Sequence, residues 1–390
     1  MEDLAQFRER VRTALATRYE VRDPERDDDR VDVMSRAPEG HHALRDAALE
    51  LQALLRSAGL SGLTLPTEYG GQGLGREYKE VLDEELRRFD TPTTRPLGLG
   101  PTLAFFTLMH AGTEEQKRRY LPRIAAGEEL WCQMFSEPDA GSDLVSLRCR
   151  AERRDGGWLI NGQKVWSSFA DGADFGLLLA RSDPDSAKPH NGITMFIAPI
   201  NAPGVEVRPL VDMAGGRHFN EVYFNDVFLA DDLVIGAVNS GWQVANGTLG
   251  TERFEYLGGS GGGRRQRQLI RLAREYGKDC DPVIRQQLAA AISSERILEW
   301  LRDRIVEGQV AGGSPACGSL IKTAAGTLEQ QVSVLRMDLA GFESVAWDAT
   351  DRDGDVESQA FCAARQSTIA GGTHQIQRNL MAERILGLPR

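Results

Sequence analysis

The stretch Gln133-Met-Phe-Ser-Glu-Pro-Asp-Ala-Gly-Ser-Asp143 is the part of the sequence from which the fold can be inferred. It combines hydroxyl side chains, small residues and one rigid proline. A loop of this composition can bring backbone N–H groups and Ser hydroxyls against carbonyl or phosphate oxygens. The same composition is also typical of a surface turn, so the surrounding sequence has to decide between the two interpretations.

Hydrophobic periodicity divides the chain into three parts around this stretch. Residues 1–130 show helical spacing of apolar residues, as do residues 241–390, whereas 131–240 contain short apolar or alternating runs separated by Gly, Pro, Asn and Asp. The sequence therefore predicts an α+β fold with a sheet domain between two helical domains. The residues behind this prediction are Leu4, Phe7, Val11 and Leu15; the runs 176–180, 193–198, 205–208 and 221–228; and Leu288, Ile292, Leu298, Leu301 and Ile305.

Composition argues against several classes of protein. The formal net charge of -11 disfavours a nucleic-acid surface, which needs clustered Lys and Arg. No apolar run is long enough to span a bilayer, and the first residues lack the pattern of a secretory signal, so we expect a cytoplasmic protein without membrane attachment. The five cysteines are scattered without a CxxC pair, and no HExxH occurs, so neither a disulfide framework nor a metal site is expected.

Two further segments accompany the opening stretch, namely Asn161-Gly-Gln-Lys-Val-Trp-Ser-Ser168 and Gly372-Thr-His-Gln-Ile-Gln-Arg378. In order and spacing, the three resemble the flavin-binding segments of the acyl-CoA dehydrogenase family. The similarity extends over nearly the whole chain, including 219–224 and 241–245. It implies an N-terminal α-helical domain, a central β-sheet domain and a C-terminal four-helix bundle that drives tetramer formation.

The resemblance implies a cofactor, FAD, and a substrate, an acyl-CoA thioester. On the strand-like segment, Trp166 would ordinarily be read as core packing, but the family places it against the flavin. Ser142 would lie near the cofactor or the thioester. The implied cofactor-binding residues are Gln133, Phe135, Ser136, Gly141, Ser142, Trp166, Ser168, Arg274, Thr373 and Gln375.

The family needs a carboxylate base, because the α-carbon of a thioester is only weakly acidic. Many members carry a Glu directly before the terminal Gly-Thr motif, but this chain has Gly371 there. Members resembling isovaleryl-CoA dehydrogenase carry the base in a Leu-x-x-Glu-Arg sequence, and this chain reads Leu249-Gly-Thr-Glu-Arg253. The resemblance therefore implies Glu252 as the catalytic base. A solvated Glu-Arg pair on a helix is the structural alternative.

Two other substrate contacts follow from the same resemblance. Arg253 is a candidate for contact with a CoA phosphate or for a structural role. The backbone N–H of Gly371 could donate a hydrogen bond to the thioester carbonyl, which would lower the barrier to α-proton removal.

The resemblance is weakest where a neighbouring subunit usually completes the flavin site. The segment 273–277 lacks one residue of the family pattern, so Arg274 is an approximate match, and 337–343 lacks the Gln and two glycines. The chain could form a homotetramer, or a heterotetramer with a homologous chain that supplies the missing loop. Electrons would pass to an electron-transferring flavoprotein; an oxidase of the same fold and a non-catalytic or half-site subunit are the alternatives.

Overall fold

The computed structural model describes residues 2–23, 42–255, 264–310, 314–345 and 356–389, and their side chains except at 101, 250–255, 264, 306, 315 and 343. Backbone contacts divide the chain into two compact units. Of the described residues, the first unit holds 2–23, 42–211 and 217–248, and the second holds 212–216 and those from 249 onward.

The N-terminal part of the first unit is helical, as predicted. Its apolar positions at helical spacing face a common core, in which Phe7, Val11 and Leu15 are fully buried and pack with Leu51 and Leu55. The described helices are α1 (Leu4–Ala16), α3 (His42–Ser57), α4 (Arg76–Arg88), α5 (Phe105–Ala111) and α6 (Glu114–Ala126).

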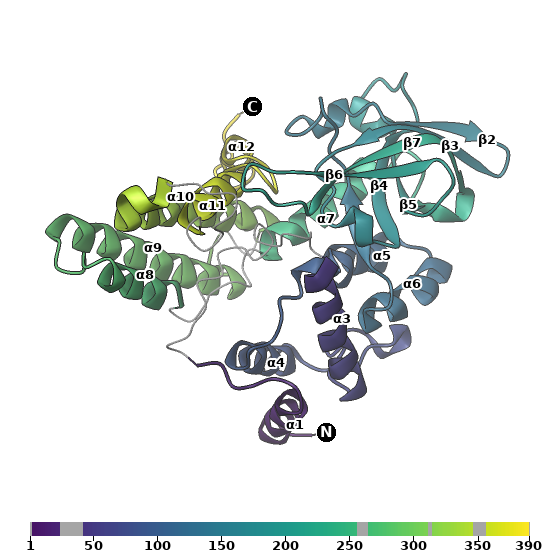
Figure 1. Ribbon diagram of the computed structural model, residues 1–390. Coiled ribbons are helices and arrows are strands. Elements are labelled where there is room, and N and C mark those ends of the chain that lie inside the picture. Colours follow the sequence, from purple (N-terminus) through teal and green to yellow (C-terminus); the bar gives the residue numbers. More distant parts are fainter. Residues whose placement is uncertain (1, 24–41, 256–263, 311–313, 346–355, 390) are drawn as a thin grey trace. The chain divides into compact units, whose positions relative to one another are not determined.

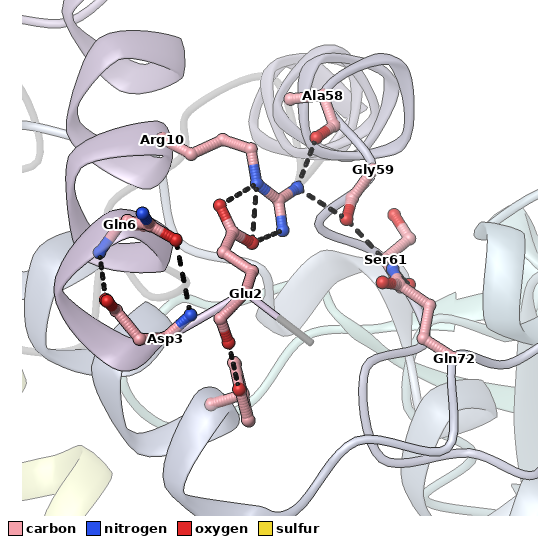
Figure 2. A network of polar contacts seen from close by, with 9 residues as sticks. Glu2, Asp3, Gln6, Arg10, Ala58, Gly59, Ser61 and Gln72 are labelled. Atoms are coloured by element: carbon pink, nitrogen blue, oxygen red, sulfur yellow. Dashed lines mark hydrogen bonds and ion pairs between the residues drawn. The ribbon is translucent and has the colours of Figure 1, made fainter.

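Arg10 of α1 attaches this helix to the turn that follows α3 (Figure 2). Its guanidinium donates to the carbonyls of Ala58 and Gly59 at 2.8 and 3.1 Å, and it pairs with Glu2 at 2.7 Å. Gln72 donates to the Gly59 carbonyl as well, at 2.9 Å. Carbonyls of the turn after α3 therefore find side-chain donors.

Helix α6 begins with a capping box. The Thr113 hydroxyl accepts from the Gln116 N–H, and the Gln116 side chain accepts from the Thr113 N–H. The Gln116 amide also donates to the carbonyls of Asp232 and Val234, at 2.7 and 2.8 Å. The cap therefore ties the helical part of the unit to its sheet.

The eight strands of the described residues form one sheet in the order β6-β7-β3-β2-β4-β5-β8, with β1 paired to β4. Figure 1 labels β2 to β7 of this sheet. The sheet is mixed, because β1 and β2 run parallel to β4 and the other pairs are antiparallel. The predicted strands at 176–180, 193–198, 205–208 and 221–228 are confirmed. Their bounds are β1 (Trp131–Met134), β2 (Arg150–Arg154), β3 (Gly157–Lys164), β4 (Phe175–Arg181), β5 (Ile193–Pro199), β6 (Val205–Leu210), β7 (Phe219–Ala230) and β8 (Val234–Ile235).

Helix α7 (Gly241–Glu255) begins in the first unit, and its last residues belong to the second. The second unit continues with α8 (Arg264–Glu275), α9 (Pro282–Val306), α10 (Gly318–Ala340), α11 (Val356–Ala364) and α12 (His374–Arg384). Helices α8, α9 and α10 share an apolar core that includes Leu269, Leu288 and Leu335. Helices, then strands, then helices is the order that the sequence predicts, and the α+β fold class is confirmed.

Candidate active site

Strand β1 leads directly into the loop part of the tract Gln133–Asp143. It lies parallel to β4, where Gln133 pairs with Leu177, and Phe135 beyond it is buried. Two hydrogen bonds, of 3.0 and 3.1 Å, then close a turn between Glu137 and Ala140. Gly141 and Ser142 follow in exposed positions, and a methyl group added at Gly141 would meet no atom within 4 Å. This end of the tract is thus accessible to a ligand.

The second predicted segment leaves the sheet earlier than the sequence suggests. Strand β3 ends at Lys164, whereas the strand-like pattern continues to Ser168. Trp166 and Phe169 adopt left-handed backbone angles, with φ of 62° and 59°, which cannot continue a pleated strand. The ordinary expectation of a core tryptophan is wrong, because Trp166 is 54% exposed; its indole makes an edge-to-face contact with Phe219.

Hydrogen bonds to β7 and to His218, which directly precedes β7, hold residues 166–169 in place. The Ser167 N–H donates to the Asn220 carbonyl at 3.0 Å, and the buried Asn220 amide donates back to the Ser167 carbonyl at 3.1 Å. The Phe169 N–H donates to the His218 carbonyl at 2.7 Å. Left-handed backbone at bulky residues persists only where surrounding contacts over-determine it, and such strain clusters at ligand sites.

The structure brings these two segments side by side. The Val165 N–H donates to the Ser136 carbonyl at 2.9 Å, and the Lys164 ammonium donates to the Phe135 carbonyl at 3.0 Å. Phe135 and Ser136 of the tract therefore lie beside Lys164 and Val165, which directly precede Trp166. We call this arrangement, comprising Gln133, Phe135, Ser136, Gly141, Ser142, Trp166 and Ser168, the cradle.

Other predicted residues lie in the second unit, at the start of α12. Thr373 is the N-cap of this helix, and its hydroxyl accepts from the Ile376 N–H at 3.2 Å. Gly371 and Gly372 before it have φ of 66° and 90°. Their carbonyls both accept from the buried Gln377 amide, at 2.7 and 3.4 Å.

This arrangement sets the direction of the backbone donors that follow. In a trans peptide the N–H points opposite to the C=O, so the N–H groups of Gly372 and Thr373 point away from Gln377. Gln375 is exposed on α12, and Arg274 is exposed near the end of α8.

The proposed base lies on α7, but the side chains of Glu252 and Arg253 lie outside the described residues. The earlier turns of this helix are fixed in the first unit. Thr248 is fully buried, and its hydroxyl bonds to that of Thr107 on α5 at 2.7 Å. At the other end, a methyl group added at Gly241 would lie 2.6 Å from the Met195 nitrogen of β5. The start of α7 therefore sits directly on the sheet.

Sequence reasoning overlooked Lys164, Glu137, Asn220 and Gln377, which hold the predicted segments in place. A signal existed for Lys164, because it has the same strand parity as the buried residues Trp158 and Ile160 and so faces the core. No comparable local signal marks Gln377, since its partners depend on the glycine turn six residues earlier.

The described side chains match a flavin better than a metal ion. The cradle presents an exposed indole, an open glycine and Ser hydroxyls, and Asn220 Oδ1 and Ser167 Oγ are buried without a hydrogen-bond partner among the described residues. Among the same residues, no group of three or more His, Cys, Asp or Glu side chains could hold a metal ion. No helix in the described part of the chain combines the length and apolarity needed to cross a membrane.

Three family models together match most of the chain. Residues 1–128 match the acyl-CoA dehydrogenase N-terminal domain, residues 132–227 the middle domain, and residues 239–386 the C-terminal domain.

Named relatives and solved structures agree with these matches. Acyl-CoA dehydrogenase IpdE1 of Mycobacterium tuberculosis is 39% identical over 86% of this chain and 86% of its own length. Acyl-CoA dehydrogenase FadE34 of the same organism is also 39% identical, over 87% of this chain, but the chain spans only 46% of FadE34. The structure titled Tcur3481-Tcur3483 steroid ACAD superposes with a TM-score of 0.79 at 26% identity, covering 100% of this chain and 99% of the other. The chain belongs to the acyl-CoA dehydrogenase family of oxidoreductases.

Proposed function

We propose that this chain catalyses the FAD-dependent α,β-dehydrogenation of an acyl-CoA thioester and passes the electrons to an electron-transferring flavoprotein. The observation that carries the proposal is the cradle, in which an exposed, strained Trp166 stands beside the Gln133–Ser142 tract. We further propose domain boundaries of 1–130, 131–240 and 241–390 for the helical, sheet and C-terminal parts.

The roles of the chain's own groups follow from its family and from chemistry. Bound FAD supplies the oxidant that accepts a hydrogen with its electron pair from the β-carbon. Glu252 removes the α-proton, and the N–H of Gly371 donates to the thioester carbonyl and stabilises the enolate-like charge that develops there.

The remaining predicted residues bind and orient. In this proposal the cradle residues line the flavin ring, Arg274, Thr373 and Gln375 contact other parts of FAD, and Arg253 contacts a CoA phosphate. Ser142 lies at the exposed end of the tract, where it could reach either the cofactor or the thioester.

The second candidate function is a half-site subunit in a heteromeric enzyme. The weak match at 337–343 favours it. In this region α10 ends at Ala340, and its C-cap Gly341 has a φ of 64°. The side chain of Phe342, which follows, is 94% exposed. The structural relatives include the ChsE4-ChsE5 complex from Mycobacterium tuberculosis, with a TM-score of 0.74, 27% identity and coverage of 100% of this chain and 99% of the other. We therefore propose a tetramer, formed either by this chain alone or with a homologous chain.

The testing experiment has two stages. The first measures FAD per chain in purified protein, expressed alone and with a homologous partner. The second adds an acyl-CoA anaerobically and follows bleaching of the flavin, using one aliphatic and one steroid side-chain thioester because the structural relative is titled a steroid ACAD.

Glu252→Gln tests the base in the second stage. We expect bleaching to slow by about 100-fold or more, the usual contribution of a general base, while FAD content stays at the wild-type level. Glu255→Gln, on the same helix, is the matched control and should bleach normally. Unimpaired bleaching by Glu252→Gln would show that another group removes the proton; flavin binding without any bleaching by the wild type would favour the half-site subunit.

A further inference from the structure

A buried ion pair joins the two segments of the cradle. The Lys164 side chain is fully buried at the end of β3, and that of Glu137 in the tract is 8% exposed. The Lys164 ammonium lies 2.7 Å from Glu137 Oε1 and 3.0 Å from the Phe135 carbonyl oxygen.

The Glu137 carboxylate has two further partners on a third segment. Its Oε1 accepts from the Cys149 N–H at 2.9 Å, and its Oε2 accepts from the Arg148 N–H at 2.6 Å. These residues directly precede β2. The pair therefore connects the loop after β1, the end of β3 and the approach to β2 at a single point.

Core stability alone does not explain charged groups at this place. Desolvating two charges costs several kcal/mol, and well-packed apolar side chains of similar volume often stabilise a core as much or more. The surrounding core is apolar and includes Cys149, Ile160 and Val222. An apolar pair could provide neither a donor for the Phe135 carbonyl nor acceptors for the Arg148 and Cys149 N–H groups.

That donor sets the direction of the tract's backbone. With the Phe135 carbonyl directed at Lys164, the N–H of Ser136 points away from it, because the two groups are opposed in a trans peptide. The Ser136 carbonyl is directed at the Val165 N–H, one residue before Trp166. Lys164 of the ion pair thus fixes the orientation of the Phe135–Ser136 peptide, and the Val165 N–H fixes that of the next peptide.

We propose that Lys164 and Glu137 are positioning residues for the flavin: the buried ion pair holds Phe135–Ser136 in register with Trp166 and so sets the affinity and electronic environment of the bound ring. This inference rests on the proposed function, because it assumes that the cradle takes FAD.

Three variants test it, namely Lys164→Met, Glu137→Gln and the charge-neutral double variant. Each is measured for FAD dissociation constant, flavin absorption spectrum and thermal midpoint. We expect the single variants to bind FAD about tenfold or more weakly with a shifted spectrum, since small misplacements of positioning groups have effects of this size. The double variant should regain thermal midpoint relative to the singles, because no unpaired charge remains, yet keep the weak binding and the altered spectrum.

The matched control is another buried ion pair, Arg336–Glu357 of α10 and α11, with both side chains 8% exposed. Arg336→Met should lower the thermal midpoint and leave the flavin spectrum unchanged. If a single variant does not fold, the double variant decides. Wild-type FAD affinity and spectrum in the double variant would overturn this inference alone. A wild-type chain that binds no FAD, with or without a homologous partner, would overturn the proposed function and this inference with it.

Discussion

Left-handed backbone is the residue-level feature that marks the candidate site. Among the described residues other than glycine, only Trp166, Phe169, Asp226 and Asn239 have positive φ. Such a conformation costs on the order of 1–3 kcal/mol at each residue, so two of them within four positions need strong support. Asn220 and His218 supply it through the bonds to Ser167 and Phe169.

Gly371 gives a residue-scale prediction. Its φ of 66° is unfavourable for any side chain with a Cβ, so Gly371→Ala should destabilise the protein by about 1–2 kcal/mol. Gly247→Ala is the control, because Gly247 lies inside α7 and an added methyl would be 3.9 Å from its nearest neighbour, on Phe106. That change should stabilise by about 0.4–1 kcal/mol. Urea denaturation of the FAD-free proteins checks both, and equal effects would contradict the backbone argument.

At the scale of elements, α1 and α4 are joined through one buried carboxylate. Glu85 of α4 is 1% exposed and accepts from Arg8 at 2.7 Å and from Arg12 at 3.0 Å. Burial by itself would raise the pKa of Glu85, but the hydrogen bonds from Arg12 and Arg8 outweigh it, and the pKa is lowered from its ordinary value of 4.5.

Because the pKa of Glu85 is lowered, the direction in which the free energy of unfolding changes with pH is known. A lowered carboxylate pKa contributes stability that is present above about pH 4.5 and is lost as the pH falls through the lowered value. Glu85→Gln should therefore lower the free energy of unfolding at neutral pH and flatten its decline below about pH 4.5. Glu84→Gln, at the exposed partner of Arg8, should change little. Urea titrations across this pH range measure both variants, and parallel curves for Glu85→Gln and wild type would contradict the prediction.

The contact between α7 and β5 gives a second prediction at this scale. In Gly241→Ala the new methyl would lie 2.6 Å from the Met195 nitrogen and from the Thr194 carbonyl carbon, so backbone has to move. We expect a loss of about 1–3 kcal/mol in stability, the usual effect of overpacking, together with slower substrate-dependent bleaching because α7 also carries Glu252. Unchanged unfolding and bleaching would show that the helix tolerates the shift.

At the scale of the whole molecule, the reactivity of three cysteines can be used to follow unfolding of the sheet. Burial raises the pKa of the Cys132 thiol to about 12 and that of Cys149 to about 11, and both lie in the sheet core. Cys280, between α8 and α9, is exposed. Because the thiolate is the reactive form, Cys280 should react with iodoacetamide in the native protein, whereas Cys132 and Cys149 should react only when the sheet unfolds. Peptide mapping after labelling in increasing urea checks this, and native labelling of Cys132 would contradict the burial.

Sequence alone determined the order of helices and strands and the similarity that identifies the family. These are local features: periodicity in α1 and alternation in β7 each report the conformation of a few consecutive residues. The Gln133–Asp143 tract was recognisable for the same reason, since its residues are contiguous.

The tertiary structure decided what contiguous residues cannot encode. The chain from Asn161 to Ser168 alternates like a strand, but Ser167 and Phe169 bond to Asn220 of β7 and to His218 before it. Trp166 between these bonds lies outside the sheet and is 54% exposed. Lys164 is an ordinary charged residue in the sequence; it becomes the buried partner of Glu137, 27 residues away, only when the loop after β1 meets the end of β3. Non-local hydrogen bonds set the geometry of the site. Each joins groups that lie far apart in the sequence, and no local sequence pattern predicts that they meet.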